Sequence, residues 1–247
     1  MNYPPGIRPR VTGPAGPYRL PYRLFARASL RLLITADGRQ GDSPGQLVDG
    51  ANFRHLSGIP SIVAQAAPWK IGPYGRYIRL ADAGAHIRTG MNVRGWADGT
   101  MIGVVRQPDP GVAVGWLAAD GVIAQSPLRF SWYTDGTDGS YSVRFGHDTV
   151  PVVVQTPPGV AVYDEWIVLQ VSWSAPTLTQ FHLNGVLIHQ NAGAVQLLND
   201  GATLRIAGNS LVEEYSDLDV GFLGIWRERL GGWASRAVMA GRTRVAA

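Results

Sequence analysis

Short apolar or alternating runs recur along the chain from residue 28 onward, separated by turn residues. The breaks between them favour turns, as at Asp109-Pro110-Gly111 and Asn199-Asp200-Gly201. About ten short strands at this spacing are typical of a β-sandwich or barrel. The pattern therefore predicts an all-β fold. Its runs lie at 29–35, 76–80, 101–106, 112–118, 128–134, 140–146, 150–155, 166–174, 179–190, 203–208 and 220–228.

Two segments depart from the strand pattern. Residues 232–241, with the sequence GWASRAVMAG, are expected to form a short helix near the end of the chain. Residues 37–75 contain Gly, Pro and Asp throughout and few alternating runs, so they are expected to form a loop region.

The run at 179–190 predicts a β-hairpin, because Asn184-Gly185 suits a type I′ turn, which needs positive φ at both central residues. Counting outward from this turn pairs Phe181 with Ile188 and Gln180 with His189. One face is then wholly apolar and is expected to be buried: Phe181, Leu183, Val186 and Ile188. The other face is expected to be more exposed, and its polar members form a candidate surface contact patch: Gln180, His182 and His189. Two histidines without a third ligand do not predict a metal site.

Composition supports the all-β prediction and narrows the class of protein. The 247 residues include 31 Gly and 17 Pro, and only 16% are charged, so one large domain with many turns is expected. The absence of Cys excludes disulfides and thiolate nucleophiles. No apolar run is long enough for a membrane span, and the polar, Pro-rich beginning does not resemble a signal peptide.

Positive charge is concentrated at the beginning of the chain. Residues 1–36 hold six arginines and no acid, which leaves a net charge of −2 for the rest of a chain whose total is +4. Six prolines within residues 4–21 disfavour both helix and central strand. These features predict an extended docking arm over residues 1–27, ahead of a sandwich over 28–247. Five arginines are expected to bind carboxylates or carbonyls of a larger assembly: Arg8, Arg10, Arg19, Arg23 and Arg27.

The second half of the chain resembles the concanavalin A-like, laminin-G-like sandwich. The resemblance rests on the strand and Asn-Gly hairpin at 166–190, the strand ending in Gly at 204–208, and the last strand and helix at 220–241. Residues 69–80 and 85–90 are similar to the opening strands of such domains. The resemblance covers about residues 45–242 and implies an antiparallel jelly-roll β-sandwich. A domain of this kind behind a short basic arm also resembles capsid-decorating or tail-associated proteins of tailed bacteriophages.

The glycan hydrolases of this superfamily carry the pattern Glu-x-Asp-x-(x)-Glu on one strand, and no segment here matches it. The densest acidic run is expected to be a solvated loop, with calcium binding and catalysis as alternatives: Glu213, Glu214, Asp217 and Asp219. The pair Asp164-Glu165 stands alone at the start of a strand. Most of the eight tryptophans are expected to pack in the core, although a sugar-stacking platform is the alternative.

These patterns lead to one principal hypothesis and three alternatives. The principal hypothesis is a non-enzymatic structural module without a cofactor, docked in several copies on a phage particle and therefore located in the virion. The first alternative is a lectin-like, carbohydrate-binding adhesion module, and the second is a glycan hydrolase. Binding of nucleic acid by the arm is not expected, because the arm lacks the aromatic stacking surface of single-strand binders.

Overall fold

The computed structural model describes most of the predicted sandwich. The described residues are 24, 27–35, 61–63, 69–72, 75–81, 84–91, 93, 95–119, 130–145, 152–192, 203–209 and 214–243. Of the arm predicted over residues 1–27, only Leu24 and Arg27 belong to this set. No helix in this part of the chain is long and apolar enough to cross a membrane.

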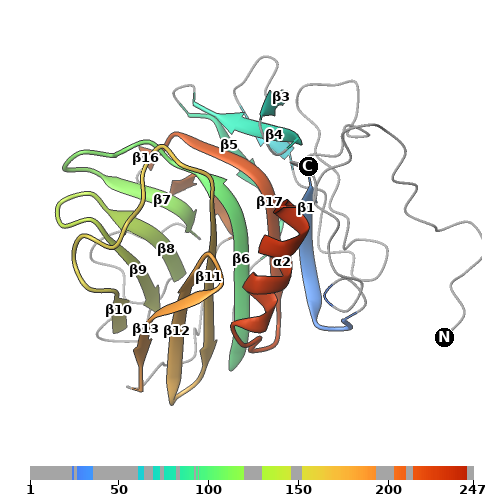
Figure 1. Ribbon diagram of the computed structural model, residues 1–247, viewed down its shortest axis with the longest axis vertical. Coiled ribbons are helices and arrows are strands. Elements are labelled where there is room, and N and C mark those ends of the chain that lie inside the picture. Colours follow the sequence, from blue (N-terminus) through green and yellow to red (C-terminus); the bar gives the residue numbers. More distant parts are fainter. Residues whose placement is uncertain are drawn as a thin grey trace, which may run out of the picture.

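Two antiparallel sheets form the body of the protein (Figure 1). In order across the first, called sheet A, lie β13 (Val186–Asn191), β12 (Leu178–Leu183), β11 (Ile167–Ser174), β6 (Asp98–Arg106), β17 (Leu218–Trp226), β4 (Gly75–Leu80) and β3 (Trp69–Gly72). A further strand of sheet A, β1 (Leu30–Thr35), also pairs with β17. Sheet B contains β10 (Val152–Gln155), β9 (Ser140–Phe145), β8 (Phe130–Asp135), β7 (Val114–Ala119), β14 (Arg205–Ile206), β5 (His86–Arg88) and β2 (Ser61–Val63).

The remaining elements are a two-stranded ladder of β15 (Gly208–Asn209) and β16 (Glu214–Tyr215), and the helix α2 (Trp233–Thr243). The structure therefore confirms the predicted all-β antiparallel sandwich with a short C-terminal helix. The loop prediction for residues 37–75 is wrong where β2 and β3 form, and the rest of that segment lies outside the described residues.

The main core lies between the two sheets. Residues that alternate along the strands point into it, including Val143 and Phe145 from β9 and Val171 and Trp173 from β11. The tryptophans that the sequence placed in strands are buried as expected: Trp116, Trp132, Trp166, Trp173 and Trp226. Phe130 and Phe145 both pack on the Trp173 ring, with centroids 5.6 Å away. Aromatic packing thus joins the two sheets.

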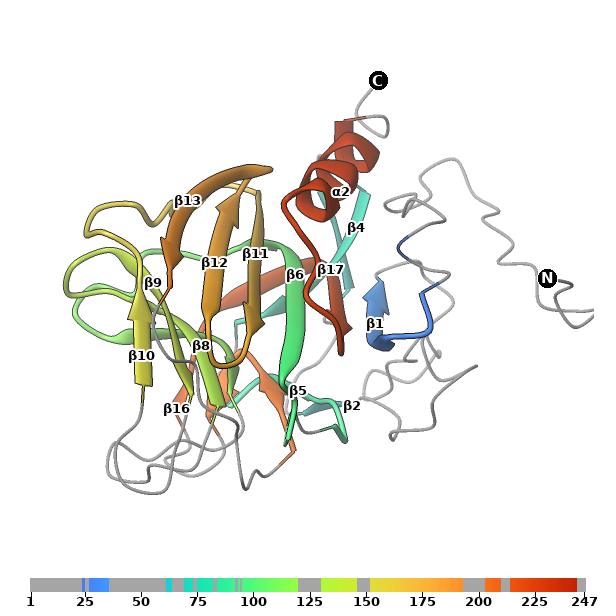
Figure 2. The same ribbon diagram turned by 90° about the horizontal axis from the view of Figure 1, so that it is seen from below.

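A second apolar cluster covers the outward face of sheet A. Figures 1 and 2 show α2 lying alongside β6 and β17, and the helix contributes Ala234, Ala237 and Val238 to this cluster. Leu24 joins it from the N-terminal side, and its carbonyl accepts a hydrogen bond from Trp226 Nε1 at 3.2 Å. The helix and the N-terminal segment thereby form a third layer. This layer explains why all nine residues of β17 are buried rather than every second one.

The hairpin prediction is correct at the turn and wrong beyond it. Asn184 and Gly185 have φ values of 49° and 82°, as a type I′ turn requires. A bulge at Ile188 then pairs Phe181 with His189 and Gln180 with Gln190. The extra residue moves His189 to the same face of the hairpin as Phe181, so His182 and His189 lie on opposite faces.

The expected exposure of this hairpin is also partly wrong. Phe181 is buried as predicted, but Val186 at the tip is 64% exposed, whereas His182 is only 4% exposed. His182 is buried because the C-terminal segment covers the outward face of sheet A at this point: a Cβ added to Gly232 would lie 2.5 Å from the imidazole Nε2. Helix packing, which the hairpin sequence does not encode, decides this side chain's environment.

Any side chain at position 99 is predicted to destabilise the protein, because the ring of Trp173 occupies the place of a side chain on Gly99. A Cβ on Gly99 would lie 2.0 Å from Trp173 Cζ2. Gly99→Ala should therefore lower the free energy of unfolding by about 1–3 kcal/mol, measured by urea denaturation. Gly231→Ala is the matched control, because its nearest contact would be an ordinary 3.5 Å to Trp233 Cδ1. Equal stability of the two variants would contradict this packing.

His182 is predicted to make stability depend on pH. Burial lowers the pKa of His182, and the nearby Arg236 guanidinium lowers it further. The unfolded chain then takes up the proton at a higher pH than the folded chain, so the free energy of unfolding should fall as the pH drops below ~6.5. His182→Asn should make this fall shallower in denaturation curves between about pH 7.5 and pH 5. Burial also lowers the pKa of His86, which should preserve part of the slope. Identical slopes in the two proteins would refute the assignment to His182.

Candidate functional site

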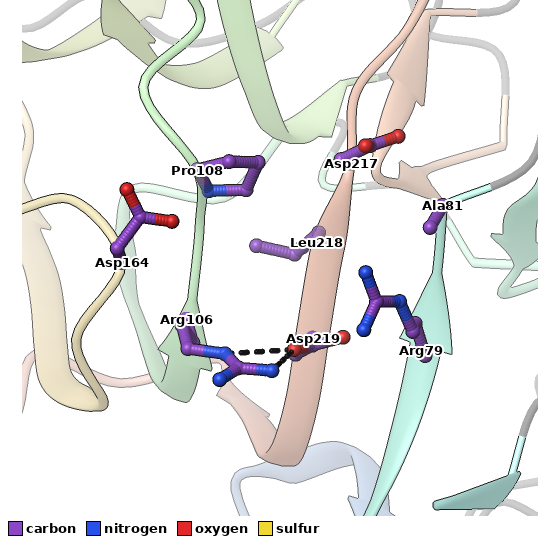
Figure 3. Close-up of a pocket in the computed structure, with 8 residues that line it drawn as sticks. All are labelled: Arg79, Ala81, Arg106, Pro108, Asp164, Asp217, Leu218 and Asp219. Carbon is purple, nitrogen blue, oxygen red and sulfur yellow. Dashed lines mark hydrogen bonds and ion pairs between the residues drawn. The ribbon is translucent and has the colours of Figure 1, made fainter.

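A pocket of about 270 Å³ lies at the end of sheet A where β4 and β6 finish and β17 begins (Figure 3). It is built from three strands of sheet A and from four connecting segments that are distant in sequence. The residues that line it are Arg79, Ala81, Arg106, Pro108, Asp164, Asp217, Leu218 and Asp219. Five of these eight are charged at neutral pH, so the pocket is suited to polar ligands.

An ion pair between Arg106 and Asp219 forms one wall of the pocket. Register places these two residues opposite each other on β6 and β17, and both face away from the main core. Arg106 Nε donates a hydrogen bond to Asp219 Oδ2 at 2.8 Å, and Nη2 also binds this oxygen. The hydrogen bond to Asp219 raises the pKa of Arg106 above its already high ordinary value. The two side chains are therefore committed to each other.

Two aromatic rings pack against the Arg106 guanidinium and help to hold it in place. Its central carbon lies 5.8 Å from the Tyr77 ring centroid and 5.5 Å from that of Trp166. These rings pack edge to face, with centroids 5.2 Å apart. Cation–π contacts of this kind contribute about 0.5–1 kcal/mol or more when partly desolvated. The wall is thus fixed by both an ion pair and aromatic packing.

Asp164 reaches the pocket from the segment before β11, in a backbone conformation that is uncommon for residues other than glycine. Its φ is 58°, and its backbone N–H donates to the Gln107 carbonyl at 2.8 Å. That bond ties the segment to the end of β6. Asp164 is exposed, and its carboxylate makes no hydrogen bond or ion pair with the part of the chain that the structure describes. It is available to a ligand.

Arg79 provides the available cation of the pocket. Arg79 on β4 lies opposite Asp219 on β17, and Arg106 on β6 lies opposite the same residue from the other side. The three side chains therefore form one row across three strands. Asp219 is already bound by Arg106, and Arg79 is exposed and has no ion pair within the described residues. Figure 3 shows Asp164 and Asp217 on opposite sides of Leu218, with Arg79 below Asp217. The pocket thus offers fork-shaped donors and a carboxylate acceptor from different elements.

The structure brings together two acidic segments that appear unrelated in sequence. Asp164 comes from the isolated Asp-Glu pair, whereas Asp217 and Asp219 come from the dense acidic run. The solvated-loop prediction is wrong for Asp219, which is 6% exposed within β17, and for Glu214, which belongs to β16. Glu213 lies outside the described residues. Among the described residues, no group of three or more His, Asp or Glu side chains is arranged to hold a metal ion.

Four of the five arginines predicted for docking lie outside the described residues: Arg8, Arg10, Arg19 and Arg23. Arg27 is described, and it contacts its own sandwich. Its guanidinium pairs with Glu228 and lies 5.3 Å from the Trp233 ring centroid. Arg27 therefore anchors the N-terminal segment beside α2, and the role of the other four arginines stays a prediction.

Gln180, His182 and His189 do not form the single surface patch that the sequence predicted. The Gln180 side-chain amide donates to Gln190 Oε1 at 2.8 Å, and its oxygen accepts from Arg229 at 3.3 Å. His182 is buried beside Gly232, whereas the His189 ring lies 6.3 Å from that of Phe181 on the opposite face. The bulge and the C-terminal segment separate the three side chains.

Sequence reasoning did not identify Arg79 or Arg106 as site residues. Each stands near the end of an apolar strand run, at a position whose side chain faces outward. Arginine at such positions is common on solvated strands, so neither residue is distinctive alone. Only the pairing of β4, β17 and β6 places them on either side of Asp219.

Comparisons with known proteins find likeness in structure but not in sequence. No protein-family model matches the chain, and no characterised protein matches it by sequence. A CBM40 of the Ruminococcus gnavus IT-sialidase, bound to alpha2,3 sialyllactose, is similar with a TM-score of 0.54 and 13% identity, over 66% of this chain and 96% of that one. The binding domain of botulinum neurotoxin serotype D is similar with a TM-score of 0.59 and 12% identity, over 87% of this chain and 51% of that one.

A third similar structure is the Trypanosoma rangeli sialidase, with a TM-score of 0.58 and 11% identity, over 89% of this chain and 34% of that one. The chain thus spans about half of the toxin binding domain and about a third of this sialidase. At identities this low the likeness concerns the fold. The chain has a β-sandwich fold that it shares with carbohydrate-binding modules and receptor-binding domains.

Proposed function

We propose that the protein is a non-enzymatic carbohydrate-binding module whose glycan site is the pocket between Arg79 and Asp164. The observation that carries this proposal is the presence of two uncommitted, opposite charges beside a wall that is already fixed. Sugar hydroxyls both donate and accept hydrogen bonds, so a carboxylate and a guanidinium on one pocket suit them. The Arg106–Asp219 pair keeps the wall rigid, which lowers the entropy cost of binding.

Two of the structural neighbours support binding rather than catalysis, whereas a third is a sialidase. One is a CBM40 with a bound sialyllactose, and another is a receptor-binding domain of a toxin. Asp219, which the acidic run offered as a catalytic candidate, is occupied by Arg106, and Asp217 also has an interaction partner. A glycan hydrolase is therefore the weaker alternative, since it needs two carboxyl groups free to act across one bond.

Docking on a phage particle has no support among these neighbours, which favour the glycan-binding alternative instead. The arginine-rich arm and the virion location stay predictions of the sequence. They are compatible with glycan binding, because a particle-borne sandwich can also act as an adhesin.

Arg79→Ala tests the proposed site. A panel that includes alpha2,3 sialyllactose, lactose and neutral oligosaccharides should reveal binding by isothermal titration calorimetry, and Arg79→Ala should weaken it roughly tenfold. Asp164→Asn should also weaken binding, because the amide replaces an acceptor oxygen by a donor. Product analysis of the same mixtures should find the glycans intact.

The matched control is Arg229→Ala, which removes an exposed arginine beside Gln180, away from the pocket. This variant should bind like the unmodified protein. Failure of every glycan to bind, or equal affinity of all three variants, would contradict the proposed site. Cleavage of a glycan that is lost in Asp164→Asn would instead establish an enzyme.

A further inference from the structure

Arginines gather on the outward face of sheet B, on the opposite side of the sandwich from the pocket. Directly paired residues form a row across this sheet, and they lie on one face because opposite positions in a sheet share a face. In order, the row is Arg88, Arg205, Ala119, Ser131, Arg144 and Val153. Three of its six members are arginines, and none is acidic.

The three arginines of this basic row are available to a ligand. Arg88 is exposed, Arg144 and Arg205 are half-buried, and none of them makes an ion pair within the described residues. Arg88 and Arg205 lie on neighbouring strands, ~4.8 Å apart at the backbone. Arg144 stands three strands further along, at about 14 Å by the same spacing. The positive charge is therefore extended across the sheet.

Several buried polar atoms along the row also lack a partner. Ser131 is 1% exposed, and its hydroxyl makes no hydrogen bond. Nε of Arg144, on the neighbouring strand, is also buried and makes no hydrogen bond. His86, two residues before Arg88, is 2% exposed and its Nε2 is unpaired, whereas its Nδ1 is bonded to the Gly84 carbonyl at 2.7 Å. Buried polar atoms are rarely left without a partner in a native protein. Because each of these atoms is already covered by protein, the polar groups that the row presents to a ligand are those of the exposed Arg88 and the half-buried Arg144 and Arg205.

We infer that this basic row binds a linear acidic polysaccharide, through carboxylate or sulfate groups spaced along the chain. Guanidinium groups bind both anions in the same forked geometry. A spread of charge over five strands, from β5 to β9, suits an extended chain better than a single ion. Single-stranded nucleic acid fits less well, because the nearby Trp116 is 7% exposed and offers no open ring for base stacking. The inference does not depend on the pocket, whose residues lie on the other sheet.

Affinity gels of dextran sulfate, polygalacturonate and uncharged dextran test the inference at an ionic strength of about 0.15 M. The full chain should be retarded by at least one of the two acidic polymers and not by dextran. The polymer that retards the chain more strongly identifies the preferred anion. Arg205→Ala and Arg144→Ala should each weaken binding roughly tenfold, and Arg205→Lys should retain only part of it, because lysine keeps the charge but loses the forked geometry.

Arg88→Ala is a further variant, whose exposed side chain can be removed with little risk to folding. Unfolding midpoints should confirm that each variant is folded. Arg229→Ala is the charge-matched control, on the connection between β17 and α2, and it should bind like the unmodified protein. No retardation by either acidic polymer would overturn the inference. So would an equal loss in the control, or tighter binding of a single-stranded oligonucleotide than of both polymers.

Discussion

The pairing of β17 on both of its edges is the constraint on which the other features of this molecule depend. One edge of the strand pairs with β6, whereas the other is shared by β4 near its beginning and β1 near its end. Because α2 and sheet B cover its two faces, every residue of β17 is buried, including Asp219. A buried carboxylate is costly unless it is paired, and Arg106 meets that need. The fixed wall of the pocket is thus a consequence of where β17 lies.

The same strand explains how the segment before β1 is joined to the segment after β17. Trp226 at its end binds the Leu24 carbonyl, and Glu228 just beyond it pairs with Arg27. The helix then returns over the outward face and buries His182. The N-terminal segment and the helix therefore act as one layer on sheet A. Sheet B has no such layer among the described helices, and its outward face carries the basic row.

Cross-strand register gathers the charged residues of both proposed sites. Arg79 and Arg106 lie on either side of Asp219, although β5 of the other sheet separates them in sequence. Register also aligns Arg88, Arg205 and Arg144 in one row across sheet B, from three strands that are distant in sequence. The two sites differ in their charges: the pocket offers one positive and one negative side chain on its opposite sides, whereas the row offers only positive charge, spread across sheet B. These differences separate the ligands expected for them.

The sequence alone determined the fold class, most strands, the final helix and the turn at Asn184-Gly185, because apolar alternation and turn chemistry are local properties. The sequence also shows a net charge of −2 over residues 37–247. That sum gives no sign that arginines cluster on the outward face of sheet B. Tertiary structure alone decided the bulge at Ile188, the burial of His182 and the convergence of the two acidic segments. A bulge costs little locally, and burial and convergence depend on which strands pair and what covers them. Those choices are set by packing over the whole sandwich, so no single segment encodes them.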